Sequence, residues 1–180
     1  MNAMRVPKFL ADENVAKLGK WLRILGYDVA YESPATDAHL ALKALRENRV
    51  ILTRDRGFSQ RRMVEKCLLL ASQNPIEQLR QVIQTFRLRL DPSQFFTRCL
   101  NCNSPIQPMP KEAVKDLVPD YVYRVHKQFN RCVTCGKLFW RGSHTQNFQA
   151  WLDQLGGVVD CGVQNEKQPQ RHGDAERIED

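Results

Sequence analysis

Two pairs of cysteines constrain the fold of this 180-residue chain more than any other feature. The pairs have C-x-x-C spacing and are Cys99 with Cys102 and Cys132 with Cys135. Two such pairs, separated by a loop or a small hairpin, are typical of a tetrahedral zinc site. Asn103 and Gly136 follow the pairs, and both residue types tolerate the left-handed backbone that points amide groups at sulfur. We therefore expect a zinc ribbon, with two disulfides or four unrelated core thiols as the alternatives.

The length and the remaining cysteines limit the setting of the protein. A chain of 180 residues can hold one medium domain, or a domain of about 100 residues and a small module that depends on a metal for stability. No apolar run approaches about 18 residues, and the first residues lack the order of a signal peptide. Cys67 and Cys161 remain as free thiols, which fit a reducing compartment. We expect a cytoplasmic protein without a membrane span.

The net charge of +7 is unevenly distributed along the chain. Residues 1–96 carry 16 Lys and Arg against 10 Asp and Glu, and residues 97–155 carry 8 against 4. Residues 156–180 are acidic, with 3 against 6. A basic folded part favours a nucleic-acid partner, and a soluble basic protein without such a partner is the alternative.

Hydrophobic periodicity predicts alternating strands and helices through the first half of the chain. We expect strands near residues 8–11, 29–31, 50–53 and 67–70, and helices near 15–25, from 37, at 61–65 and from 75. Asn74, Pro75 and Glu77 have the spacing of an N-cap, a first helical residue and a capping box. This alternation predicts a parallel sheet flanked by helices.

Three regions follow from these patterns. The Asp91-Pro92-Ser93 segment marks a boundary, so we expect an α/β domain at residues 1–94 and a zinc ribbon at 95–155. The ribbon region ends with a closing helix near 148–155 that packs back onto the first domain. Residues 156–180 are polar and acidic, which predicts a disordered tail.

Three aspartates mark the candidate active site. Asp12 follows the first strand, Asp55 follows the third, and Asp37 begins the helix between them. Ligands of open parallel sheets bind at the carboxyl ends of the strands, and clustered carboxylates suit Mg²⁺ or Mn²⁺. In the alternative interpretation, Asp12 and Asp37 cap helices and Asp55 forms a turn.

Basic residues surround these acids in the sequence, as a phosphodiester nuclease requires. The candidate RNA contacts are Lys17, Lys20, Arg23, Arg54, Arg56, Arg61 and Arg141, with Arg62 beside them. For each of them, a solvated helix face is the alternative. Arg141 follows Phe139 and Trp140, two aromatic residues that either stack on a base or pack the small core of the ribbon.

Several motifs resemble a known family. The segment 9–14 (FLADEN) resembles the first strand and acid of PIN-domain ribonucleases, and 52–58 (LTRDRGF) resembles their Thr-x-Asp segment. Together with 17–28, 47–55 and 135–144, these segments resemble the Mut-seven C-terminal RNase family, a PIN-like nuclease domain followed by a zinc ribbon. The resemblance covers roughly residues 5–155. It implies an RNA substrate, and it implies that Asp12, Asp37 and Asp55 bind the catalytic metal.

One position departs from the PIN pattern. Many PIN enzymes carry a fourth acid two residues after the Thr-x-Asp aspartate, where this chain has Gly57. A three-acid site holds one tight metal, or it recruits Glu13 or Asp28 as a further ligand.

The leading hypothesis is a metal-dependent ribonuclease acting on single-stranded RNA, with the ribbon as a structural and RNA-binding module. The alternative is a non-catalytic zinc-ribbon protein that binds RNA or the ribosome and has a vestigial acidic pocket. A third hypothesis is a toxin-type nuclease held by a partner protein.

Overall fold

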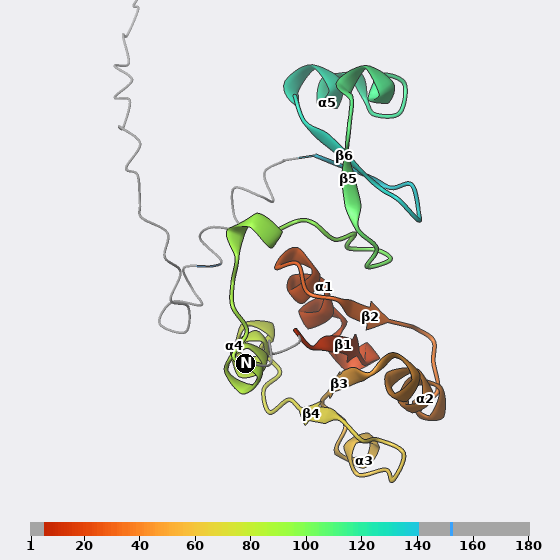
Figure 1. The fold of residues 1–180 in the computed structure, drawn as a ribbon, viewed down its shortest axis with the longest axis vertical. Coiled ribbons are helices and arrows are strands. Elements are labelled where there is room, and N and C mark those ends of the chain that lie inside the picture. Colours follow the sequence, from red (N-terminus) through yellow and green to blue (C-terminus); the bar gives the residue numbers. More distant parts are fainter. Residues whose placement is uncertain (1–5, 141–151, 153–180) are drawn as a thin grey trace, which may run out of the picture.

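The computed structural model describes residues 6–140 and Leu152, and it contains two sheets (Figure 1). The larger is a four-stranded sheet in the order β2-β1-β3-β4, with every neighbouring pair parallel. Its strands are β1 (Lys8–Ala11), β2 (Val29–Tyr31), β3 (Arg49–Thr53) and β4 (Cys67–Leu69). The prediction of a parallel sheet flanked by helices is confirmed.

Helices cover both faces of this sheet. They are α1 (Ala16–Ile24), α2 (Asp37–Glu47), α3 (Arg56–Ser59) and α4 (Pro75–Phe86). Successive residues of a strand point to opposite faces. Phe9 and Ala11 of β1 accordingly pack in the core formed with α1 and α4, whereas Leu10 packs with α2 and Phe58 of α3.

Two glycines allow close contacts of α1 and of the turn that follows it. Gly19 faces the sheet, and a Cβ there would lie 3.0 Å from the Cβ of Ala11. Gly26 follows the helix with φ +91°, and a Cβ there would lie 2.5 Å from the carbonyl oxygen of Gln94. Only glycine fits that turn, which brings the chain after α4 against the end of α1.

The basic helix predicted at residues 61–65 is wrong. The structure has turns there and places a single helical turn, α3, earlier in the chain. Asp55 caps α3, and the Phe58 side chain anchors it, being 1% exposed. Residues 61–65 have no fully buried side chain, because Met63 is 51% exposed and Val64, which packs against the cluster of Leu10 and Phe58, is only half-buried.

Helix α4 begins as the sequence predicts but without the full capping box. The Asn74 side chain accepts a hydrogen bond of 2.9 Å from the Ile76 amide, and Pro75 is the first helical residue. The backbone N–H of Asn74 donates to the Ser72 hydroxyl at 2.9 Å. Ser72 therefore takes the place that the capping box assigns to Glu77.

The smaller sheet belongs to the cysteine-containing region. Its antiparallel strands are β5 (Ile106–Met109), β6 (Phe129–Cys132) and β7 (Leu138–Trp140), in that order. Short helical segments are η1 (Glu13–Val15), η2 (Pro92–Gln94), η3 (Lys111–Val114) and α5 (Asp120–Val125). Val114 and Phe129 are the buried apolar residues of this region apart from the cysteines. Such a small core agrees with a module that depends on a metal.

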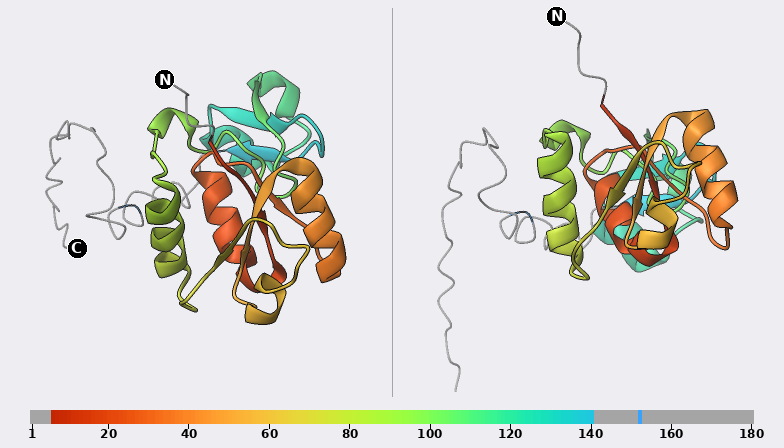
Figure 2. Two further views of the ribbon diagram at one scale, coloured as in Figure 1. Left: turned by 60° about the horizontal axis from the view of Figure 1, so that its bottom comes forward. Right: turned by 90° about the horizontal axis from the view of Figure 1, so that it is seen from below.

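The three-stranded region docks where α1 ends and β2 begins. The amide of Phe96 donates to the Ile24 carbonyl at 2.8 Å, and the Arg98 side chain donates to the Gly26 carbonyl at 2.9 Å. These contacts lie at the amino-terminal edge of the parallel sheet. In the left view of Figure 2 this region lies at the top, and α3, which follows the carboxyl end of β3, lies at the bottom.

Some predicted features lie outside the described residues. These are Arg141, the acidic tail at 156–180 and most of the closing helix near 148–155. Leu152 is described, and it packs against the core formed by β1, α1 and α4. None of the helices in the described part is long and apolar enough to cross a membrane.

Candidate functional site

Asp12 and Asp55 lie next to each other at the carboxyl edge of the parallel sheet. They follow the neighbouring strands β1 and β3, in which Ala11 pairs with Leu52. Thr53 connects them, since its hydroxyl donates to Oδ2 of Asp12 at 2.6 Å and accepts from the Asp55 amide at 3.0 Å. Thr53 has no exposed surface, so this link is shielded from water.

Asn14 adds a second link at the same edge. Its Nδ2 donates to Oδ2 of Asp12 at 2.6 Å, and its Oδ1 accepts from the Arg54 amide at 3.1 Å. The motifs at 9–14 and 52–58 include Asn14 and Thr53, but the sequence did not show what these two side chains do. The usable signal is their spacing, because each polar side chain stands two residues from an aspartate at a strand end.

The capping alternative is correct for two of the three aspartates. Asp12 caps η1 by accepting from the Glu13 amide at 2.6 Å. Asp55 caps α3 by accepting from the Gly57 and Phe58 amides at 2.7 and 3.1 Å, both on Oδ1. In the described structure, capping thus occupies one oxygen of Asp55 and does not exclude a second role for the carboxylate.

Asp37 is placed apart from this pair. It is the first residue of α2, whose N-cap is Thr36, and its Oδ2 lies 2.6 Å from Nη2 of Arg61. Within the described residues, the four cysteines form the one group of three or more acidic, His or Cys side chains arranged to hold a metal. The predicted convergence of Asp12, Asp37 and Asp55 is therefore partial.

The two substitutes for a fourth acid differ in their positions. Asp28 precedes β2 at the opposite edge of the sheet, where it accepts from Arg49 at 2.6 Å and from Asn103 at 2.8 Å. Its proposed role as a ligand beside Asp12 is wrong for this geometric reason. Glu13 is exposed next to Asp12, and it accepts from the Ser33 hydroxyl at 3.1 Å.

Most of the predicted RNA contacts are accessible. Lys17, Lys20, Arg56, Arg61 and Arg62 are exposed and Arg54 is half-buried. The prediction that Arg23 contacts RNA is wrong, because only 3% of this residue is exposed. Its guanidinium donates to the carbonyls of Val29, Leu100 and Asn101, so it is not available to a nucleic acid.

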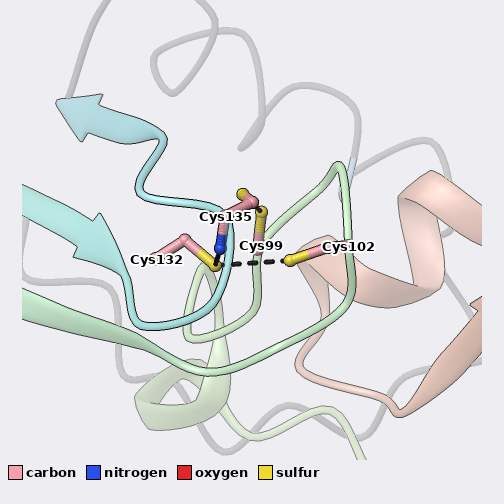
Figure 3. Close-up of side chains that lie close together, drawn as sticks. All are labelled: Cys99, Cys102, Cys132 and Cys135. Atoms are coloured by element: carbon pink, nitrogen blue, oxygen red, sulfur yellow. Dashed lines mark hydrogen bonds between the residues drawn. The ribbon is translucent and has the colours of Figure 1, made fainter.

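The four predicted zinc ligands converge on one point (Figure 3). Their sulfur atoms all lie within 4.8 Å of one another, with Cys99 to Cys135 at 3.6 Å and Cys102 to Cys132 at 3.3 Å. Tetrahedral Zn–S bonds of about 2.3 Å place sulfurs about 3.8 Å apart, so the cluster fits zinc closely. All four are free thiols, and these separations exceed the S–S bond length of about 2.05 Å, so the disulfide alternative is wrong.

The backbone of both cysteine turns has the predicted conformation. Asn103 has φ 69° and Gly136 has φ 71°, and the Cys135 amide donates to the Cys132 sulfur at 3.4 Å. Burial opposes ionisation of Cys102, but hydrogen bonds from Ser104 outweigh it and lower the pKa of Cys102 to about 6. Burial raises the pKa of its neighbour Cys99 to about 12. One of these thiols is therefore ready to ionise, as metal binding requires.

The fold and the site define a two-part protein, with an α/β domain that carries acids at its carboxyl edge and a four-cysteine ribbon at the other edge. The model of the Mut7-C RNAse domain family matches residues 7–152. Because the match covers most of the chain, the chain belongs to this family, whose name identifies it as a ribonuclease domain. No curated protein matches the chain.

Proposed function

We propose that this protein is a metal-dependent ribonuclease that hydrolyses phosphodiester bonds of single-stranded RNA. The observation that carries the proposal is the linked pair of carboxylates, Asp12 and Asp55, at the carboxyl edge of a parallel sheet in a Mut7-C RNAse domain. Ligands of open α/β sheets bind at that edge. Residues 1–94 form the catalytic part in this proposal, and the protein acts in the cytoplasm.

The donor atoms at this edge fit a hard divalent cation. Asp12 and Asp55 supply carboxylate oxygens, and Mg²⁺ and Mn²⁺ prefer such ligands. Asp37 joins them only after it leaves Arg61. That pair is exposed, with side chains 56% and 36% accessible, and such pairs contribute about 0–1 kcal/mol. A bound Mg²⁺ or Mn²⁺ would activate water and neutralise charge on the phosphate.

The protein's own side chains prepare the site and hold the substrate. Thr53 and Asn14 both donate to Oδ2 of Asp12, which fixes the orientation of that carboxylate before substrate binds. The basic residues on α1 and after β3 bind phosphates on either side of the scissile bond. Arg61, once released from Asp37, adds a further positive charge to this surface. In this proposal Glu13, the exposed neighbour of Asp12, supplies the acid that Gly57 does not.

The ribbon has a separate role in this proposal. Cys99, Cys102, Cys132 and Cys135 hold one Zn²⁺ with four thiolates and leave no open position, so the metal stabilises residues 95–155 and takes no part in hydrolysis. Its exposed basic residues, together with Arg141, contact RNA beyond the cleavage site.

The decisive experiment replaces the central carboxylate without disturbing its capping role. Asp12→Asn keeps an N-cap, because asparagine caps as well as aspartate. The asparagine NH2 group cannot accept the bonds that Thr53 and Asn14 donate to Oδ2, so we expect a loss of about 1–3 kcal/mol in the free energy of unfolding. The chain should still fold and bind zinc, and single-turnover cleavage of single-stranded RNA should fall at least about 100-fold.

Asp91→Asn is the matched control. Asp91 also caps a short 3-10 helix, η2, by accepting from a backbone amide, and it stands far along the chain from the acidic edge. This variant should cleave like the parent. Undiminished cleavage by Asp12→Asn would exclude the proposed site.

A non-catalytic RNA-binding protein is the second candidate. Gly57 and the pairing of Asp37 with Arg61 favour it, because both leave the acidic edge incomplete. Titration with Mn²⁺ separates the candidates. A nuclease gains thermal stability and cleaves RNA, whereas a binding protein does neither and still binds RNA with steep salt dependence.

A further inference from the structure

Arg23 is a buried cation that contacts the first cysteine turn. It lies in the last turn of α1, and its Nε donates to the Val29 carbonyl at 2.8 Å. Its Nη1 donates to the carbonyls of Leu100 and Asn101 at 2.8 and 3.1 Å. Those two residues are the ones between Cys99 and Cys102. The guanidinium therefore joins the nuclease domain to the loop that carries two of the four sulfur ligands.

A buried guanidinium needs a counter-charge, because removing a charge from water costs several kcal/mol. Among the described residues, the ion pairs within 4.0 Å do not include Arg23; the arginines in them are Arg49, Arg61 and Arg98, and the other cations are His39 and Lys43. Burial lowers the pKa of Arg23, and the negative charges that oppose this effect come first from Cys99 and Cys102 and then from Asp28. The bonds to the Leu100 and Asn101 carbonyls hold the guanidinium at the loop between Cys99 and Cys102, so the cysteine cluster lies beside it as a source of negative charge once zinc is bound.

We propose that Arg23 is the counter-ion of the zinc-bound cysteines and that it couples zinc occupancy to the order of the α1–β2 turn. The inference rests on the zinc site proposed above, and it does not depend on the ribonuclease activity. Four thiolates and one Zn²⁺ carry a net charge of −2, which a single buried cation partly balances. Without the metal the Cys99–Cys102 loop is no longer fixed, so the Leu100 and Asn101 carbonyls lose the positions in which they accept from Arg23.

A second side chain from the same loop strengthens the coupling. Asn103 follows Cys102, and its Oδ1 accepts from the Val29 amide at 3.0 Å. Its Nδ2 donates to Asp28 at 2.8 Å. Asn103 makes these contacts from a left-handed backbone conformation that the cysteine turn imposes. The turn around Cys102 and the start of β2 thus share several hydrogen bonds, so loss of one disturbs the other.

The first test compares two substitutions of Arg23 by their zinc affinity, measured by competition with a chromophoric chelator. Arg23→Gln keeps hydrogen-bond donors but removes the charge, and we expect its zinc affinity to fall about 10–100-fold. Arg23→Lys keeps the charge, and we expect a loss of less than about tenfold. Arg46→Gln, a change at an exposed arginine of α2, is the control and should bind zinc like the parent.

The outcomes separate the inference from the proposals on which it depends. Parent-like zinc affinity in Arg23→Gln, or equal losses in both variants, would overturn the counter-ion role. A parent chain that binds no zinc would overturn the zinc site as well. RNA cleavage is not measured, so failure of the ribonuclease proposal leaves this result unaffected.

The second test uses the unmodified chain and so does not depend on a variant that folds. Backbone hydrogen exchange is compared with zinc bound and after removal of zinc by a chelator. We expect protection to be lost at the amides of residues 99–103 and also at Leu25, Gly26 and Val29, while the α4 amides keep theirs. Loss confined to residues 95–140 would overturn the coupling.

Discussion

Thr53 shows how much of the candidate active site depends on one buried hydroxyl. It donates to Asp12, accepts from the Asp55 amide and lies 3.4 Å from Nδ2 of Asn14. A valine has nearly the same shape but can make none of these bonds. Its methyl group would leave the Asp55 amide without its partner and Asp12 with one donor fewer on Oδ2.

We therefore predict that Thr53→Val lowers the free energy of unfolding by about 1–3 kcal/mol, the cost of a buried polar group without its partner. RNA cleavage should fall as well, because Asp12 loses a bond that orients it. Thr53→Ser keeps the hydroxyl and should retain most of both properties. Chemical denaturation and single-turnover cleavage measure the two effects. A valine variant as stable and active as the parent would show that the link has no role.

At the scale of single residues, the sequence predicted which side chains belong to a site better than it predicted which residues they contact. Asp12, Asp55 and the four cysteines could be identified because their spacing follows strand ends and cysteine turns. Arg23 could not, since arginines are almost always exposed and its burial results from docking of residues 100 and 101, far along the chain. The pairing of Asp37 with Arg61 is likewise a tertiary contact that no local pattern reports.

At the scale of elements, Asp28 joins β2, β3 and the ribbon. It accepts from Arg49 of β3 and from Asn103 after the first cysteine turn, and Arg98 lies 3.9 Å away. Burial would raise the pKa of Asp28, but the hydrogen bonds from Arg49 and Asn103 outweigh it and hold that pKa below its ordinary value. A carboxylate with a depressed pKa stabilises the fold above its unfolded pKa, and this stabilisation is lost as the pH falls through the folded value.

We predict that Asp28→Asn lowers the free energy of unfolding by about 1–3 kcal/mol near neutral pH. The difference from the parent should be constant above about pH 5 and should shrink below about pH 4, where the parent carboxylate takes up a proton. Denaturation curves at a series of pH values measure it, with the exposed Asp116→Asn variant as control. A difference that persists unchanged to pH 3 would show that the charge is not its source.

Elements with strong periodicity were predictable and short ones were not. The four strands and the helices α1, α2 and α4 follow from apolar spacing, because each buries one face against the sheet. Helix α3 has four residues and depends on the Asp55 cap and one buried aromatic ring. It is too short to show a hydrophobic periodicity in the sequence. The predicted helix at 61–65 failed because basic composition without an apolar face does not select a helix.

The whole molecule places its two candidate functions at opposite edges of the parallel sheet. The acids follow the carboxyl ends of β1 and β3, whereas the ribbon docks at the start of β2. Nothing in the sequence indicated this separation, since it depends on hydrogen bonds between residues more than 70 positions apart. Under the proposed function, a short RNA at the acidic edge would not reach the ribbon, and only a longer RNA would contact both.

This arrangement predicts that ribbon charges matter only for long substrates. The exposed Lys115, Arg124 and Lys127 lie in the ribbon, and we change all three to Gln. Affinity for an RNA of about 16 nucleotides should fall, and its salt dependence should weaken by a slope of about 2, since each lost phosphate contact contributes about 0.7 in single strands. Binding and cleavage of an RNA of about four nucleotides should be unchanged.

Lys17→Gln with Lys20→Gln provides the contrast, because these residues lie on α1, which begins at the acidic edge. That variant should weaken binding of both RNAs. Filter binding at several salt concentrations measures affinity, and single-turnover cleavage measures the reaction. If the ribbon variant binds the long RNA as tightly as the parent, the ribbon only stabilises the fold. If the ribbon variant weakens binding of the short RNA equally, one short substrate contacts both edges. The RNA must then cross the face of the sheet to reach the acids.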